Sequence, residues 1–376
     1  MSKLGHEVYV VTRSNNRENI ENYLSKNKIV NLNFIYFDYP KWFLRIIKGK
    51  LNPYAYLYFF FWQIGIFFAT RSLIKKIKFD FIHHVTFVSL RFPNLLCLHK
   101  IPFIFGPISG GDKIPYQLRK NFPFMFKFKE FLRDLNNSYI KISPLMNITF
   151  SKSHKIFVNS KETKKLIPSR YHHKTEELLA IGTDDLPKIN NNIFENKKLF
   201  NICYAGNLIN IKGLLIALKT FSEIKKNNNN AIFTIIGSGP MEFELKQIAK
   251  KYKIDDSIKW LGRINRKELF SIFTKSDLLF MPSLRDSGGF VVIEAMSCGL
   301  PVAVLDIGGP GQIVNNECGI KVNVNKKNEN QIALELATQI NDLMNNNEKL
   351  KYKKIKSLER VKEFTWNKKA SIVYNI

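Results

Sequence analysis

The chain has 376 residues, which exceeds one ordinary hydrophobic core and suits two domains. Its hydrophobic content of 45% excludes a disordered chain, and its four scattered cysteines, without a CxxC pair, argue against a disulfide scaffold or a zinc site and suit a reducing cytoplasm. The net charge of +27 leaves three interpretations open: a nucleic-acid binder, a protein beside anionic membrane lipid, or a lysine-rich composition without functional meaning.

The chain opens on KLGHEVYVVT, which is typical of a helix end closed by Gly5 and followed by a strand. In a doubly wound sheet a strand, a loop and a helix come before such a strand. We therefore expect that a βα unit of about thirty residues precedes the sequence given. Without its strand, the strands that would flank it in the sheet lose a hydrogen-bonding partner.

Apolar runs predict strands in the first half at 7–12, 33–37, 79–85, 102–106 and 155–160. Residues 1–160 carry 24 Lys and Arg against 8 Asp and Glu, and basic and aromatic residues alternate in YPKWFLRIIKGK (39–50). This pattern favours contact with an anionic membrane face. Nucleic acid is disfavoured, because no helix-turn-helix, zinc-finger or aromatic RNA-binding motif is present.

The run YAYLYFFFWQIGIFFAT (54–70) is the membrane-like stretch of the sequence. It is about 17 residues long, the lower limit for crossing a bilayer, and Gln63 and Gly65 interrupt it. A transmembrane helix is one interpretation. We favour a helix that is buried against a sheet or dips into the membrane interface.

In the second half, strands are predicted at 200–206, 231–237, 257–262, 277–282 and 301–306, with helical segments between them. The polar, Pro- and Asn-rich stretch 181–198 is a candidate linker. This alternation predicts an α/β protein with two parallel sheets of about five strands, and a ligand site in the cleft between them.

The segment with the most candidate site residues is MPSLRDSGGFVVIEAMSCGLPVAVLDIGGPG (281–311). A strand ends at Pro282, and a helix opens near Gly288–Gly289, where a phosphate could approach backbone N–H groups favoured by the helix dipole. The carboxylates of Asp286 and Glu294, eight positions apart, could hold hydroxyls at two ends of an elongated ligand. The plain alternative is an ordinary strand–turn–helix unit with solvated carboxylates.

Residues 286–302, DSGGFVVIEAMSCGLPV, resemble the donor-binding motif of the retaining glycosyltransferases of family 4, which have the GT-B fold. Asp286 departs from the glutamate usual there. A second segment, YAGNLINIKGLLIAL (204–218), is similar to the family's diphosphate-binding pattern: Lys212 and its glycine match, whereas Asn207 stands in place of an arginine. Arg263 or Arg285 could compensate for the missing charge.

The resemblance implies two Rossmann-like, doubly wound domains that face a cleft. We expect an N-terminal acceptor domain at 1–186, a donor domain at 187–362, and a helix at 363–376 returning to the first domain. The expected catalytic residues are Lys212, Asp286 and Glu294. The expected donor-binding residues are Gly206, Asn207, Gly262, Arg263, Arg285, Gly288, Gly289 and Phe290. On the acceptor side we expect His84, Gly110 and Gly111. A structural histidine is the favoured alternative for His84, and a turn explains the two glycines equally well.

The resemblance also implies transfer with retention of anomeric configuration, from a nucleotide-diphosphate sugar to a lipid-linked or oligosaccharide acceptor in bacterial surface polysaccharide synthesis. No DxD-like pair stands out, so we expect no metal and no cofactor. We expect a cytoplasmic protein, peripheral on the inner face of the membrane. The rival hypotheses are a catalytically dead or truncated binding protein, a sugar-nucleotide epimerase of the same fold, and a basic nucleic-acid binder.

Overall fold

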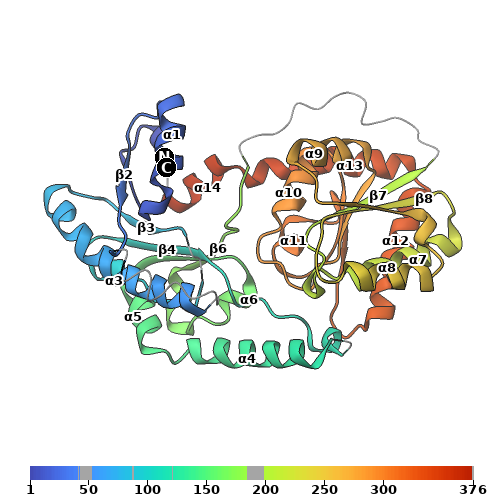
Figure 1. Ribbon diagram of the computed structural model, residues 1–376, viewed down its shortest axis with the longest axis horizontal. Helices are drawn as coiled ribbons and strands as arrows, with labels where there is room; N and C mark the ends of the chain where they lie inside the picture. Colours follow the sequence, from blue (N-terminus) through green and yellow to red (C-terminus); the bar gives the residue numbers. More distant parts are fainter. Residues whose placement is uncertain (41, 43–52, 87–88, 121, 184–198, 375–376) are drawn as a thin grey trace. The chain divides into compact units, whose positions relative to one another are not determined.

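The computed structural model describes residues 1–40, 42, 53–86, 89–120, 122–183 and 199–374. The chain forms two compact units (Figure 1). Unit 1 comprises residues 1–106, 140–157 and 170–175, and unit 2 comprises residues 107–139, 158–169 and 176–376. Most of the candidate linker at 181–198 and of the basic, aromatic stretch at 39–50 lies outside the described residues. The predicted domain boundaries at 186 and 362 stay predictions.

The strands of unit 1 belong to two sheets. Strands β1 (Val8–Thr12) and β2 (Leu32–Tyr36) pair in parallel and are joined by helix α1 (Arg17–Lys26). The other sheet has the order β3-β4-β5-β6 and lies mainly in unit 1. Its strands are β3 (Ile82–His84), β4 (Phe103–Ile108), β5 (Ser153–Val158) and β6 (Thr175–Glu177). The first half therefore differs from the predicted single sheet, since among the described residues β1 and β3 have one neighbour each.

The membrane-like run forms helix α3 (Pro53–Lys76), which packs on its own unit. The Trp62 indole donates to the Phe37 carbonyl over 2.9 Å, and a Cβ at Gly65 would lie 2.3 Å from the Phe37 ring. Glycine thus lets the helix approach the end of β2. Among the described helices, α3 is the one whose length and composition would suit a membrane span, with a mean hydropathy of 1.4 over Leu57–Lys76.

Unit 2 is built on a six-stranded sheet with the order β12-β11-β10-β7-β8-β9, in which all the pairings are parallel (Figure 1). Its strands are β7 (Phe200–Ala205), β8 (Ala231–Ile236), β9 (Ile258–Gly262), β10 (Leu278–Met281), β11 (Val302–Leu305) and β12 (Gly319–Val322). The strand order reverses between β7 and β10. In open α/β sheets, ligands bind beyond the carboxyl ends of the strands at such a reversal.

Helices cover both faces of this sheet, which explains why its strands are continuous apolar runs. One face packs against α7 (Leu214–Asn227), α8 (Glu242–Lys251) and α12 (Glu329–Met344). The other face packs against α9 (Arg266–Lys275), α10 (Phe290–Ser297), α11 (Gly308–Ile313) and α13 (Asn347–Val361). Along β7, Ile202 and Tyr204 enter the first core, while Cys203 and Ala205 enter the second.

Unit 2 also contains helix α4 (Phe124–Ile140) up to Tyr139, the turn η4 (Tyr116–Arg119) and the C-terminal helix α14 (Trp366–Tyr374). In α14 the Lys369 ammonium donates to the Leu179 carbonyl over 2.6 Å. The last helix therefore contacts residue 179 within unit 2, and its predicted return to the N-terminal domain stays a prediction.

All ten predicted strands are present, with ends shifted by at most a few residues. Two strands were missed. β6 is short and carries two exposed glutamates, so it has no apolar run to detect. β12 is four residues long and follows a polar turn.

Candidate active site in unit 2

The loop after β10 leads into α10 through a backbone that requires glycine. Gly289 is the N-cap of α10 with φ +77°, the left-handed region that side chains disfavour. Gly299, with φ +73°, follows the other end, where the Leu300 N–H donates to the Ala295 carbonyl. Both ends of this helix therefore lie where the sequence predicts them.

Asp286 lies in the loop that precedes α10 and holds the backbone just before the helix. Its Oδ1 accepts the backbone N–H groups of Gly288 and Gly289, both over 3.1 Å. Its Oδ2 accepts from the Lys212 ammonium over 2.5 Å, and both side chains are largely buried, at 14% and 18% exposure. The structure thus brings Lys212 and three predicted site residues that lie 74 or more positions from it into one hydrogen-bonded cluster.

Lys212 reaches this cluster because two chain segments touch without side chains between them. It ends the turn η7 (Asn210–Lys212), and Gly213 then caps α7 with φ +70°. A Cβ at Gly213 would lie 1.9 Å from the Pro282 carbonyl oxygen. The N–H groups of Leu284 and Arg285 donate to the Ile211 carbonyl over 2.9 and 3.3 Å, which holds the two loops together.

Two further glycines, which the sequence reasoning did not single out, hold the same loop from the other side. A Cβ at Gly308 would lie 2.3 Å from the Asp286 carbonyl oxygen, and one at Gly309 would lie 2.4 Å from the Gly288 carbonyl oxygen. The Gly309 N–H donates to the Asp286 carbonyl over 2.7 Å. The GGPG run after β11 was the available signal, since paired glycines allow backbone to approach backbone.

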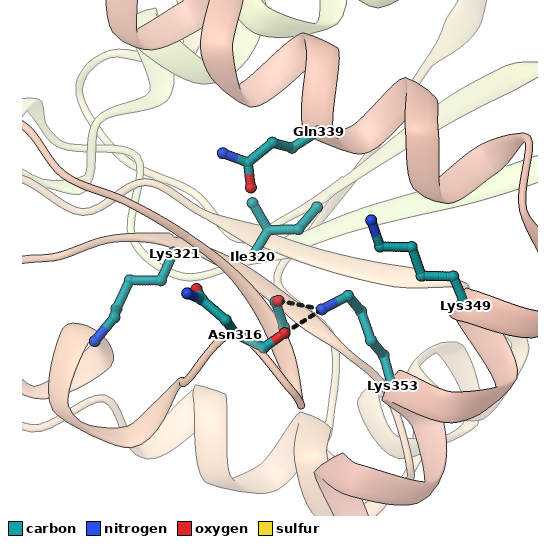
Figure 2. A pocket seen from close by; sticks show the side chains of 7 residues that line it. Asn316, Ile320, Lys321, Gln339, Lys349 and Lys353 are labelled. Atoms are coloured by element: carbon teal, nitrogen blue, oxygen red, sulfur yellow. Dashed lines mark hydrogen bonds between the residues drawn. The ribbon is translucent and has the colours of Figure 1, made fainter.

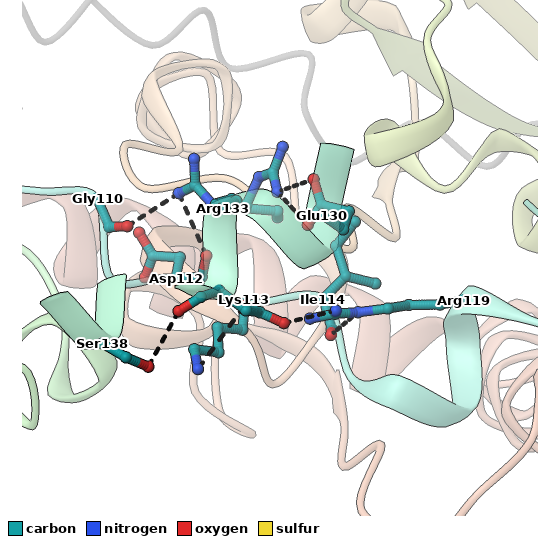
Figure 3. Close-up of polar contacts among 10 residues, drawn as sticks. Gly110, Asp112, Lys113, Ile114, Arg119, Glu130, Arg133 and Ser138 are labelled. Atoms are coloured by element: carbon teal, nitrogen blue, oxygen red, sulfur yellow. Dashed lines mark hydrogen bonds and ion pairs between the residues drawn. The ribbon is translucent and has the colours of Figure 1, made fainter. Parts of the chain in front are cut away.

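Arg285 makes a strong ion pair that the sequence did not predict. Its Nη1 lies 2.6 Å from both carboxylate oxygens of Glu130, whose side chain is 4% exposed. Glu130 belongs to α4, and Figure 3 shows it beside the other polar residues of that helix. Its neighbour Arg133 donates to the carbonyls of Gly110 and Asp112 over 3.0 and 3.4 Å. Arg285, one of the two arginines expected to compensate for Asn207, is therefore paired with Glu130.

Glu294 lies in the second turn of α10 and pairs with Arg266, which was also not predicted, over 3.2 Å. Burial raises the pKa of Glu294, and the Arg266 guanidinium only partly offsets this. Phe290, at the first position of α10, is 46% exposed. A largely buried carboxylate with a perturbed pKa is typical of a functional site.

The remaining donor-side residues lie at the ends of β7, β8 and β9. A Cβ at Gly237 would lie 1.9 Å from the Gly206 carbonyl oxygen, so these strand ends also touch directly. The Asn207 carbonyl accepts from the Tyr204 hydroxyl over 3.0 Å, and Arg263 donates to the Ser238 hydroxyl over 2.7 Å. Gly262, with φ +65°, ends β9 in open space.

The predicted acceptor-side residues fall in different units. His84 lies in unit 1, where its ring stacks against Phe59 and Phe105 at centroid distances of 6.3 and 5.6 Å. Burial first, and then the neighbouring His83, lowers the pKa of His84 to about 4. In unit 2 a Cβ at Gly111 would lie 2.5 Å from the Thr163 Cα, so that glycine serves a close backbone contact.

The described residues contain no group of three or more His, Cys, Asp or Glu side chains that could hold a metal ion. A cavity of about 240 Å³ opens elsewhere in unit 2, beside the edge strand β12, and contains no predicted site residue (Figure 2). In it the Lys353 ammonium donates to the Gly319 carbonyl over 2.8 Å, which supports the edge strand. The cluster around Asp286 lies instead in the loops that follow β7 and β10.

Two protein-family models together match nearly the whole chain. The model for glycosyl transferases group 1 matches residues 186–357, and the model for Glycosyltransferase Family 4 matches residues 1–179. Among solved structures, a glycosyltransferase from Rickettsia africae has a TM-score of 0.60 at 16% identity and covers 99% of this chain and 91% of its own. HepE from Anabaena, in complex with UDP and glucose, has a TM-score of 0.57 at 15% identity and covers 94% and 88%. These likenesses confirm the predicted GT-B fold.

Characterised relatives match over shorter stretches. The Schizosaccharomyces pombe phosphatidylinositol N-acetylglucosaminyltransferase gpi3 subunit is 27% identical over 119 residues, which are 32% of this chain and 26% of that protein. Protein CapJ from Staphylococcus aureus is 26% identical over 157 residues, 41% and 40% of the two chains. The D-inositol 3-phosphate glycosyltransferase of Pseudarthrobacter chlorophenolicus is 31% identical over 114 residues, 29% and 27%. The matches thus span no more than about two fifths of these relatives.

Proposed function

Because the chain belongs to the family 4 glycosyltransferases, we propose that it transfers a sugar from a nucleotide-diphosphate sugar to an acceptor hydroxyl, with unit 2 binding the donor. The observation that carries the proposal is the cluster of Lys212, Asp286 and the N-terminus of α10 at the carboxyl ends of the strands. An ammonium and two backbone N–H groups at one point attract an anion such as a diphosphate.

Asp286 accepts hydrogen bonds from the ammonium and from both backbone N–H groups. A donor would exchange partners: a sugar hydroxyl would donate to the carboxylate, and the diphosphate oxygens would accept from the ammonium. The barrier to transfer lies in breaking the anomeric C–O bond while negative charge builds on the departing diphosphate. Positive groups aimed at that charge in advance stabilise the transition state. We assign this role to Lys212, because Asn207 is uncharged and Arg285 is already paired with Glu130.

For the acceptor we propose a lipid-linked or oligosaccharide hydroxyl in the synthesis of a bacterial surface polysaccharide, such as a capsule, an O-antigen or a lipopolysaccharide, with retention at the anomeric carbon and without a metal ion. The name of the Schizosaccharomyces pombe relative gives that protein a lipid acceptor. The dense positive charge of residues 1–160 supports a site beside anionic lipid, on the inner face of the membrane.

The donor site is tested by thermal stabilisation and by slow donor hydrolysis with UDP-, GDP- and ADP-sugars. UDP-glucose is the first donor to try, since HepE was solved with UDP and glucose. We expect one nucleotide sugar to raise the melting temperature of the wild type and not of Glu294→Ala. The control is Glu244→Ala, an exposed glutamate on α8, which should respond like the wild type.

A folded wild type that responds to no donor would favour the dead binding protein and overturn the proposal. Inversion of the donor C2 centre without an acceptor would favour the epimerase. A response that survives in Glu294→Ala would move the donor site away from α10.

A further inference from the structure

Helix α4 (Phe124–Ile140) is amphipathic in the reverse of the usual sense. Soluble proteins bury the apolar stripe of a surface helix and expose its polar face. The buried side of α4 carries polar residues: Glu130 is 3% exposed and Asn137 is fully buried. The side that carries most of its apolar residues is exposed, at 78% for Phe124, 61% for Phe131 and 60% for Leu135.

We call the exposed apolar residues of this helix the α4 outer face. It consists of Phe124, Met125, Phe128, Phe131, Leu132, Leu135 and Tyr139. At about 100° per residue these seven positions fall within one arc of about 120°, and the buried polar residues fall on the opposite side. Seven large apolar side chains on one face exceed the scattered exposed residues of an ordinary surface and mark an interaction site.

Charge on both sides of this arc indicates the partner. Lys127 and Lys129 project about 40° beyond either margin of the α4 outer face, by the same helical geometry. Both lysines are exposed. An apolar face with lysines at its margins is typical of a helix that lies in the interface of a membrane, with side chains among the acyl chains and ammonium groups at the phosphates.

A protein partner would fit this surface less well. The core of a protein interface is bordered by a polar rim of mixed charge, whereas the margins here are cationic and the chain carries a net charge of +27. Anionic lipid matches both the apolar arc and the positive margins.

We propose that the α4 outer face docks unit 2 onto an anionic lipid surface. The proposal adds a docking surface to the proposed function, and its lipid-binding step does not depend on sugar transfer. The opposite side of the same helix holds Glu130, which pairs with Arg285 next to Asp286. Docking through one face would therefore hold the donor site at a fixed height above the lipid, where a lipid-linked hydroxyl arrives.

The test is flotation of the full chain with two kinds of vesicle. One is phosphatidylcholine alone, and the other also contains about 30% phosphatidylglycerol, whose anionic headgroups mimic those of an inner leaflet. The variant is Phe128→Gln/Phe131→Gln/Leu135→Gln. The matched control is Leu334→Gln/Tyr352→Gln/Ile355→Gln, three comparably exposed apolar residues on α12 and α13. We expect the wild type and the control to float with the anionic vesicles, and the α4 variant to partition at least about tenfold more weakly.

A second variant tests how much the two marginal lysines contribute to vesicle binding. Lys127→Glu/Lys129→Glu should lose binding to anionic vesicles, whereas Lys250→Glu/Lys251→Glu on α8, which makes the same change in charge, should lose less. Equal losses in the two would overturn the role of the α4 margins.

Wild-type binding that the α4 triple variant retains would also overturn the proposal, as would a wild type that floats with neither vesicle. A wild-type dimer that becomes monomeric in the triple variant would instead assign the face to a second copy of the chain. Far-UV circular dichroism and melting show whether the triple variant is folded. Donor-induced stabilisation of that variant reports on the proposed function separately, so the two failures are distinguishable.

Discussion

The polar residues at strand ends have different surroundings in the two units. In unit 2, the residues after β7 and β10 meet one another: Lys212 bonds to Asp286, which bonds to the N-terminus of α10. In unit 1, the ring of His84 at the end of β3 stacks against Phe59 and Phe105 and pairs with no charged side chain among the described residues. Both positions satisfy the rule that ligands bind at the carboxyl ends of parallel strands. A strand end is therefore a candidate site where its side chains pair with charged or hydrogen-bonding groups from other segments.

The largest expected effect is on the chemistry of the unit 2 cluster. We expect Lys212→Ala to lower donor turnover by about 10²- to 10³-fold, the size seen when one preorganised group that stabilises transition-state charge is removed. Lys226→Ala, an exposed lysine at the other end of α7, should leave turnover unchanged. Steady-state rates of transfer or donor hydrolysis provide the measurement. Equal rates for Lys212→Ala and the wild type would mean that the cluster is structural, like the surroundings of His84.

The next effect is on stability, at the pair that joins α4 to the cluster. Glu130→Ala leaves the Arg285 guanidinium, which is 17% exposed, without its carboxylate, and removing one partner of a buried pair costs about 3–5 kcal/mol of unfolding free energy. The double variant Glu130→Ala/Arg285→Ala should recover part of this loss, because no unpaired charge remains. Urea denaturation of the single and double variants measures the coupling, and strict additivity would show that the pair contributes nothing.

Ten strands were predictable as apolar runs, which for the central strands of unit 2 follows from burial on both faces, whereas β6 and β12 were not. The motif residues around Asp286 were predictable because they lie within one strand–loop–helix unit. The pairs that complete the site were not. Glu130 and Arg285 are 155 positions apart, and no local period relates them. Only the fold brings such residues together.

Helix α4 shows a different limit of sequence reasoning. Its period separates an apolar face from a polar face, but periodicity does not state which face the protein buries. The usual assignment would place Phe128 and Phe131 inside and Glu130 outside, whereas the structure has the reverse. The burial of Glu130 becomes understandable only once Arg285 is seen beside it.

Two glycines of unit 2 with left-handed backbone, Gly213 and Gly262, differ in whether a Cβ would meet another chain segment. Gly262→Ala should cost about 1–2 kcal/mol, since a Cβ there meets open space and only the φ of +65° is unfavourable. Gly213→Ala should cost about 1–3 kcal/mol more, because its Cβ would also lie 1.9 Å from the Pro282 carbonyl and force the two loops apart. Thermal or urea unfolding of both variants tests this. Equal losses would mean that the loops move apart easily and that the approach of Lys212 to Asp286 is not held by backbone contact.

The smallest expected effect tests the interior of unit 1 through pH. The pKa of His84 in the folded chain is about 4, below its ordinary value of 6.5, because burial disfavours the charged ring. The unfolded chain therefore binds the proton more readily, and the contribution of His84 to stability is complete above pH 6.5 and is lost as the pH falls towards 4. In His84→Phe, whose ring fits between Phe59 and Phe105, this part of the acid-induced loss should disappear, whereas His154→Phe at an exposed position should follow the wild type. Melting temperatures between pH 4 and 7 measure the difference. A His84→Phe curve parallel to that of the wild type would mean that the ring is reached by solvent, and unit 1 would then have a polar strand end open to ligands, as unit 2 has.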